Sequence, residues 1–261
     1  ACAGAVFTSP TPEQMLEATK AVDGGAGVFY VVKNYTGDVL NFEMAGELAE
    51  AEEIQTDYVV TNDDVAVEDS TYTSGRRGIA GTIFVHKISG AAADDGRDLA
   101  GVKEIAERVN GNMRSMGMAL TSCIPPESGE PIFEIGDDEM EIGMGIHGEP
   151  GTERKKIEPA DQIVEDLLEK VLGDNVDFTQ GDVAVMVNGL GGTPLMELYV
   201  AYAHVADVLE REGVNVYKMA YVGEYMTSLE MAGFSVSLLK LDEEMKGYLE
   251  APCDVAAGRP F

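Results

Sequence analysis

The clearest candidate for chemistry is His147, in the segment GMGIHGEPG of residues 143–151. Four glycines and one proline surround this histidine, so its neighbours offer almost no side-chain cover. Glycine is typical where the main chain turns sharply or where another molecule approaches the backbone, and a core histidine would need more cover than this. The segment is therefore predicted to form the wall of a pocket that His147 lines.

A second candidate pair follows an apolar run. Residues 27–32 read GVFYVV, a short run of aromatic and β-branched residues typical of a strand, and a helical pattern extends from Val39 to Glu52. The polar stretch KNYTGD lies between them and contains Lys33 and Asp38. Strands joined by helices form a parallel sheet, and ligands bind in the loops at the carboxyl ends of its strands. Lys33 and Asp38 are predicted to lie in such a loop.

A glycine-rich motif, NGLGGTP at residues 188–194, follows an expected strand and opens an expected helix, as a phosphate-binding loop would. The motif has neither the G-x-G-x-x-G spacing of a dinucleotide site nor the lysine of a P-loop. A tight connection capped by Thr193 is the favoured interpretation.

The other histidines and two acidic residues are weaker candidates. His86 falls near the end of an expected strand and His204 within an expected helix, and neither has a second ligand at metal spacing. Both are interpreted as structural or surface residues. Asp63 and Asp64 stand at a strand end and could be functional, although an acidic turn is the favoured interpretation.

The elements that position these residues alternate between strand and helix. The pattern predicts strands at 57–62, 81–88, 182–188, 215–222 and 234–241. One helix is predicted to begin at Thr11, and another to follow the strand at 81–88 and end at about Asn110. Two more are predicted at 159–172 and 194–211. The fold class is α/β, with two α/β domains: the first a mainly parallel sheet with helices on both faces, the second a smaller α/β sandwich. The glycine- and proline-rich stretch 117–131 suggests a boundary between domains 1–116 and 117–261.

Composition limits the possible partners. Asp and Glu outnumber Lys and Arg by 47 to 18, and the net charge of -29 disfavours both nucleic acid and anionic membrane surfaces. Such an acidic chain is typical of proteins from halophiles. The three cysteines show no C-x-x-C pair, no secretory signal is recognisable, and no apolar run is long enough to span a membrane. A cytoplasmic location is predicted.

Five segments resemble the dihydroxyacetone-binding subunit of dihydroxyacetone kinases, and the resemblance extends from about Phe7 to about Pro252. They occupy residues 7–45 (FTSPTPEQMLEATKAVDGGAGVFYVVKNYTGDVLNFEMA), 62–70 (NDDVAVEDS), 75–88 (GRRGIAGTIFVHKI), 145–151 (GIHGEPG) and 187–199 (VNGLGGTPLMELY). The resemblance implies two α/β domains and a homodimer. It also implies that His147 forms a covalent hemiaminal with dihydroxyacetone, that Asp38 contacts a substrate hydroxyl and takes part in acid/base chemistry, and that Lys33 contacts the substrate.

Two departures from the family bear on activity. An upstream family segment that ends in G-S-G-H-E-P, with an additional acid/base histidine, is not in this sequence, and a missing amino terminus is the favoured explanation. In the ATP-dependent form of the family a nucleotide-binding domain follows on the same polypeptide, and this sequence does not contain it. The resemblance then implies no cofactor on this chain. ADP and magnesium are expected on a separate L-type subunit, which an M-type phosphotransferase protein rephosphorylates. The alternative is a non-catalytic dihydroxyacetone-binding regulator of the same fold.

Overall fold

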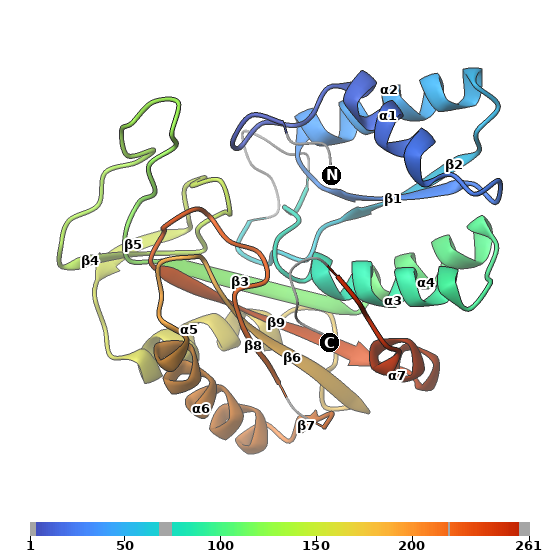
Figure 1. Cartoon of the computed structure of the whole chain (residues 1–261). Coiled ribbons are helices and arrows are strands. Elements are labelled where there is room, and N and C mark those ends of the chain that lie inside the picture. The colour runs from blue at the N-terminus through green and yellow to red at the C-terminus, as the bar shows by residue number, and fades with distance from the viewer. Residues whose placement is uncertain (1–3, 68–74, 219, 256–261) are drawn as a thin grey trace.

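The computed structural model describes residues 4–67, 75–218 and 220–255, and its elements form alternating layers of helix and sheet (Figure 1). A two-stranded parallel sheet, β1 (Val28–Lys33) and β2 (Thr56–Thr61), lies between two helical layers. The helices on its outer face are α1 (Pro12–Val22) and α2 (Thr36–Ala51). The helices on its inner face are α3 (Thr82–Asp94) and α4 (Leu99–Gly111), which also contact the second sheet.

The second sheet has seven strands in the order β5-β4-β3-β9-β6-β7, with β8 also paired to β6. The strands are β3 (Met113–Ala119), β4 (Glu139–Ile142), β5 (Glu153–Lys156), β6 (Asp182–Gly189), β7 (Asn215–Val216), β8 (Tyr221–Gly223) and β9 (Gly233–Leu241). All pairs are antiparallel except those of β6 with β7 and β8. Helices α5 (Ala160–Leu172) and α6 (Leu195–Arg211) cover one face, and α7 (Glu243–Glu250) joins α3 and α4 on the other.

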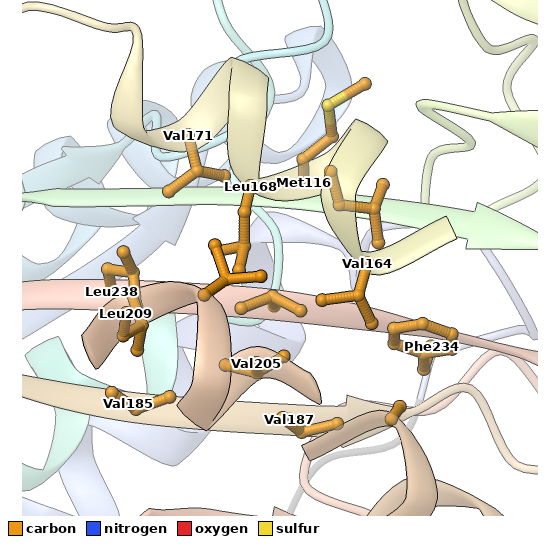
Figure 2. Packing of buried hydrophobic residues seen from close by; sticks show 14 of the residues in the cluster. Met116, Val164, Leu168, Val171, Val185, Val187, Val205, Leu209, Phe234 and Leu238 are labelled. Atoms are coloured by element: carbon orange, nitrogen blue, oxygen red, sulfur yellow. The ribbon is translucent and has the colours of Figure 1, made fainter. Parts of the chain in front are cut away.

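The alternation of side chains along the central strands divides the core into two clusters. In β6, Val185 and Val187 pack toward α5 and α6, whereas Ala184 and Met186, at the alternate positions, pack toward α3 and α7. Figure 2 shows the first cluster, where β6 and β9 residues meet Val164 and Leu168 of α5 and Val205 and Leu209 of α6. Because both faces of the sheet are covered, its central strands β3, β6 and β9 are buried along almost their whole length.

Several expected elements are confirmed. The run at 27–32 and that at 57–62 form β1 and β2, and the expected helices at 159–172 and 194–211 form α5 and α6. The capping box is present at the start of α1: Gln14 N–H donates to Thr11 Oγ1, and Thr11 N–H donates to Gln14 Oε1.

The strand expected at 81–88 is wrong, because these residues open helix α3. The β-branched and aromatic run GTIFVHKI favours a strand by local propensity, but Phe84, Val85, Ile88 and Ala92 recur at helical spacing and are fully buried. Burial of this face between the two sheets outweighs local propensity.

The expected division of the chain at residues 116 and 117 falls within β3. This strand pairs with β9 along its whole length, from Met113 opposite Leu239 to Ala119 opposite Gly233. The glycine and proline residues that suggested a boundary belong in part to the strand and in part to the loop that follows it. The sheet built largely from residues 117–261 is also the larger of the two, not the smaller.

Candidate functional site

Lys33, Asp38 and His147 line one cavity of about 940 Å³. The remaining lining residues come from residues 6–10, from the start of α2, from the His147 loop, from the 120–138 loop through Pro125 and Ile132, and from Met226 and Thr227. The structure therefore brings together all three residues that the sequence singles out, although more than 100 positions separate Asp38 from His147. Cavities of about 760 and 1030 Å³ lie elsewhere on the surface and contain none of the three.

Lys33 and Asp38 do not share a loop as expected. Lys33 is the last residue of β1, and Asp38 lies in the first turn of α2, which begins at Thr36. Helix α2 begins three residues before the expected start at Val39, because the last residues of KNYTGD, which are typical of a turn in sequence, form its first helical turn. A carboxylate is favourable at this end of a helix, where the backbone N–H groups point outward.

The His147 loop forms a wall of this cavity, as its glycine content predicts. Gly148 adopts φ of +76°, and a Cβ added there would overlap the Ile132 side chain of the neighbouring loop. A Cβ at Gly145 would overlap the carboxylate of Glu149. From the other side, Ser228 Oγ donates a hydrogen bond to Ile146 O at 2.6 Å. The glycines are needed for close packing around the loop as well as for access to His147.

The imidazole of His147 is held on several sides, yet 26% of its side chain stays exposed. Its Nδ1 lies 3.0 Å from Glu149 Oε1, and its backbone N–H donates to Glu149 Oε2 at 3.0 Å. The rings of Tyr35 and Phe7 meet it edge to face, at centroid distances of 4.6 and 5.3 Å. The ring is thus fixed in orientation with part of its surface toward the cavity.

The ionisation of Glu149 decides which ring nitrogen of His147 carries a proton. Burial raises the pKa of Glu149, but the hydrogen bonds that it accepts from the ring and the backbone N–H of His147 outweigh burial, so the pKa lies below its usual value. The ionised carboxylate can only accept hydrogen bonds, so Nδ1 of a neutral His147 carries the hydrogen. Nε2 then keeps its lone pair, and it is the nitrogen available for attack on an electrophile.

Arg77 ties the His147 loop to the residues that follow β2. Its guanidinium is 1% exposed and pairs with Asp64 at 2.7 Å. Nη2 of Arg77 also donates to Gly143 O at 2.7 Å, at the beginning of the loop. Burial raises the pKa of Asp64 to about 6, while Arg77 opposes that rise. The side chain therefore connects the segment that follows β2 to the His147 loop.

Asp63 and Asp64 are not an exposed acidic turn, because both are fully buried. Asp63 accepts hydrogen bonds from the N–H groups of Ile79 and Gly81, at 2.9 and 2.8 Å. Neither carboxylate lines the cavity. Their positions after a strand suggested possible function, but their contacts show that they hold the segment that precedes α3.

The structure adds Ser9, Tyr35, Glu149 and Arg77 to the residues around the site. The hydroxyls of Ser9 and Tyr35 are buried and have no hydrogen-bond partner within the described residues, and both residues line the cavity. Burial also raises the pKa of Tyr35, which keeps its hydroxyl protonated. The sequence signal for Tyr35 and Glu149 was their place inside the two motifs already singled out. Ser9 and Arg77 lie in the segments 7–45 and 75–88 that carry the family resemblance, but no motif singled out either side chain.

The remaining candidates lie away from the cavity. His86 is exposed on α3, and His204 on α6 contacts Glu165 at 3.0 Å in a surface ion cluster. Thr193 does not cap α6; instead its hydroxyl exchanges hydrogen bonds with the backbone of Gly233. A Cβ at Gly191 would overlap Leu229 O, so this glycine turn packs against its own chain, as a tight connection should.

In the described part of the chain, no group of three or more His, Cys, Asp or Glu side chains is placed to hold a metal ion. Of the helices within the described ranges, none combines the length and apolar character needed to cross a bilayer.

A family model and several known proteins match this chain over most of its length. The model of the Dak1 domain matches residues 1–257. The chain is 52% identical over 258 residues to a PTS-dependent dihydroxyacetone kinase, dihydroxyacetone-binding subunit, from Listeria innocua, covering 98% of this chain and 78% of that protein.

Among solved structures, it is similar to a dihydroxyacetone kinase operon co-activator, with a TM-score of 0.87, 34% identity, and coverage of 94% of this chain and 76% of that one. It is also similar to the dihydroxyacetone kinase of C. freundii, with a TM-score of 0.83, 35% identity, and coverage of 95% and 44%. The chain belongs to the Dak1 domain family.

Proposed function

We propose that this protein is the substrate-binding subunit of a dihydroxyacetone kinase. It captures dihydroxyacetone as a hemiaminal on His147 and presents a hydroxyl of the adduct to a phosphoryl donor on a partner protein. The observation that carries the proposal is the common cavity of His147, Asp38 and Lys33, with the Nε2 of His147 left as the basic nitrogen. The named function of the Listeria innocua relative supports it.

Covalent capture suits the chemistry of so small a ligand. Dihydroxyacetone has little apolar surface, and water solvates its hydroxyls as well as a protein does, so ordinary contacts bind it weakly. A bond to the carbonyl carbon adds affinity and excludes glycerol, which has no carbonyl. The exposed quarter of the His147 side chain gives the ketone access to the ring.

The capture step balances without a cofactor. The Nε2 lone pair of His147 forms a bond to the carbonyl carbon, and the π pair of the carbonyl moves onto oxygen, which takes a proton from solvent. The product has a hydroxyl on the captured carbon and an alkylated imidazolium that keeps its Nδ1 hydrogen. Glu149, 3.0 Å from Nδ1, faces the positive charge that this step creates.

Asp38 and Lys33 act on the hydroxyl that receives the phosphoryl group. In the transfer, the hydroxyl oxygen forms a bond to phosphorus as the bond to the donor oxygen breaks, and Asp38 accepts the hydroxyl proton. Lys33 supplies positive charge near the hydroxyl and the transferring group. Both belong to the β1–α2 segment, so one short stretch of chain positions the acceptor.

The nucleotide and its magnesium are assigned to the partner. The proposed partner is an L-type subunit that holds ADP and is rephosphorylated by an M-type phosphotransferase protein. It must dock over the His147 loop and the first turn of α2, because donor phosphorus and acceptor oxygen must come into line and water must be excluded. A homodimer and a cytoplasmic location stay predictions, the second resting on the cysteine usage.

A second candidate function is a dihydroxyacetone-binding regulator. The similarity to a solved operon co-activator favours it as an alternative. A regulator needs His147 for capture but has no need of a proton acceptor beside the acceptor hydroxyl. The presence of Asp38 in the cavity therefore favours the kinase subunit.

A reconstituted assay separates these functions. The purified protein with dihydroxyacetone, ATP and magnesium should form no dihydroxyacetone phosphate. Product should appear only when the ADP-carrying subunit and a phosphorylated donor protein are added. Binding of dihydroxyacetone without turnover in the complete mixture would support the regulator instead. Turnover with ATP and the purified protein alone, with partner contamination excluded by mass spectrometry, would contradict the assigned division of labour.

A further inference from the structure

Glu149 makes an unusual pair of contacts with His147. Its Oε1 lies 3.0 Å from Nδ1 of the ring, and its Oε2 accepts the backbone N–H of the same residue at 3.0 Å. The side chain of Glu149 is only 7% exposed. One buried carboxylate thus holds both the ring and the main chain of His147, and each oxygen has a separate donor.

The surroundings of Glu149 fit it to this position. Its Oε2 occupies the space that a Cβ at Gly145 would need, and Nη1 of Arg77 lies beside the same point. Arg77 in turn is anchored by Asp64 and by Gly143 O. The carboxylate is therefore seated against bare backbone and a buried guanidinium, which fixes its direction toward the ring.

We propose that Glu149 is a positioning residue for covalent capture: it holds His147 in the Nδ1–H form and offsets the positive charge that attack by Nε2 creates. This inference rests on the proposed function of His147. Glu149 does not contact the ketone in this arrangement. It acts by presenting the lone pair of Nε2 toward the cavity and by facing the imidazolium of the adduct.

The energetic reason is the environment of the pair. Alkylation at Nε2 makes the ring cationic, and an isolated cation beside a buried wall would be poorly solvated. A carboxylate at hydrogen-bond distance interacts with that cation far more strongly at a partly buried site than in bulk water. The adduct should therefore be stabilised relative to the free ketone, and the reverse reaction should be slowed.

Replacement of Glu149 by glutamine gives a specific expectation. An amide offers one acceptor oxygen and one NH2 group, whereas His147 presents two donors, its backbone N–H and Nδ1–H. If the oxygen accepts the backbone N–H, the NH2 group faces Nδ1 and favours a ring with its hydrogen on Nε2. The nitrogen that faces the ketone then lacks a free lone pair. Glu149→Asp keeps the negative charge on a shorter side chain, so adduct formation should be weakened less than in Glu149→Gln.

Glu141 provides a matched control. It is another buried glutamate, 6% exposed, and its Oε1 accepts the N–H of Gly151 at the far end of the same loop. Its Oε2 accepts from Arg154 Nε at 2.8 Å, and it has no contact with His147 among those described. Glu141→Gln thus perturbs the loop through a buried carboxylate without altering the partner of Nδ1.

The first measurement needs no ligand. Nitrogen NMR of protein with labelled histidine distinguishes Nδ1–H from Nε2–H for each of the three histidines. His147 should be Nδ1–H in the native protein and in Glu141→Gln, and should shift toward Nε2–H in Glu149→Gln. Retention of the native tautomer in Glu149→Gln would overturn the inference. If the glutamine variant does not fold, the same measurement is made on Glu149→Asp, which keeps the carboxylate and should retain Nδ1–H.

The second measurement titrates each protein with dihydroxyacetone labelled at the carbonyl carbon. Carbon NMR should show that Glu149→Gln weakens adduct formation by about 10- to 100-fold, by analogy with the loss of a residue that orients a metal-binding histidine. Glu141→Gln should stay within about twofold of the native protein. Equal weakening of adduct formation in Glu149→Gln and Glu141→Gln would show that Glu149 only supports the loop. Absence of an adduct in the native protein would instead contradict the proposed function, so the two failures are distinguishable.

Discussion

At the scale of single residues, capture and transfer are assigned to different side chains. His147 has a fixed ring, and its Nε2 makes no hydrogen bond within the described residues, which suits bond formation to a carbonyl. Asp38 lies on a separate element, in the first turn of α2, and can accept a proton without touching the imidazole adduct. Substitution of one should therefore leave the function of the other measurable.

Asp38→Asn should preserve capture and reduce turnover. The amide keeps the shape of the carboxylate but accepts no proton, so turnover in the reconstituted system should fall by about 100-fold or more. Glu47→Gln, an exposed carboxylate on the same helix, should have no effect and serves as the control. Unchanged turnover in Asp38→Asn would remove this residue from the chemistry.

The sequence located His147 and Asp38 through motifs, but it did not reveal what holds His147. Glu149 is only two positions away, and the return of its carboxylate onto the ring and N–H of His147 depends on the turn of the loop. Arg77 reaches the loop from a distant part of the chain. Such contacts follow from three-dimensional packing and leave no local pattern.

At the scale of elements, an ion cluster joins the end of α5 to β3. Asp174, 12% exposed, lies just after α5 and pairs with Arg114 of β3 and with Arg76. Burial would raise the pKa of Asp174, but hydrogen bonds from the two arginines outweigh it and hold the pKa well below its usual value. The cluster should therefore anchor this loop while Asp174 is ionised.

Asp174→Asn should destabilise the protein by about 3 kcal/mol at pH 7, because it leaves two arginines without their shared partner. The folded pKa is depressed, so the native contribution is complete above the unfolded value of 3.8 and is lost as pH falls toward the folded value. Urea unfolding should show the difference between native and variant narrowing from pH 5 to pH 2.5. A constant difference over that range would contradict the assignment.

The elements that were predicted correctly are those whose local pattern agrees with their environment. The apolar runs of β1 and β6 and the amphipathic spacing of α5 are examples. Helix α3 was missed because burial on a helical face overrode its β propensity. Strand β3 was missed because MRSMGMA has no β-branched residue, and its identity comes from pairing with β9, more than 100 positions later.

At the scale of the whole molecule, the charge excess must be distributed over a surface with few cations. The net charge is -29, and many of the 18 basic residues are already used in ion pairs, such as Lys155 with Asp166 and Arg211 with Glu165. The remaining carboxylates repel one another, and salt screens that repulsion. The composition alone predicted this repulsion among carboxylates. The arrangement of two sheets around α3 and α4 could be seen only in the structure.

Thermal stability should accordingly rise between low and molar potassium chloride. The melting temperature, followed by circular dichroism at fixed pH, should increase most steeply at low salt, where the screening length changes most. A flat or falling melting temperature across the range would contradict the interpretation of the chain as adapted to salt.

The proposed function requires His147 to form the bond to the substrate. Carbon NMR with dihydroxyacetone labelled at its carbonyl tests it most directly, using the native protein, His147→Ala, and His204→Ala as the control histidine on α6. The ketone signal should convert to that of a tetrahedral carbon in the native and His204→Ala proteins, and should not convert in His147→Ala. A tetrahedral adduct that persists in folded His147→Ala would contradict the account.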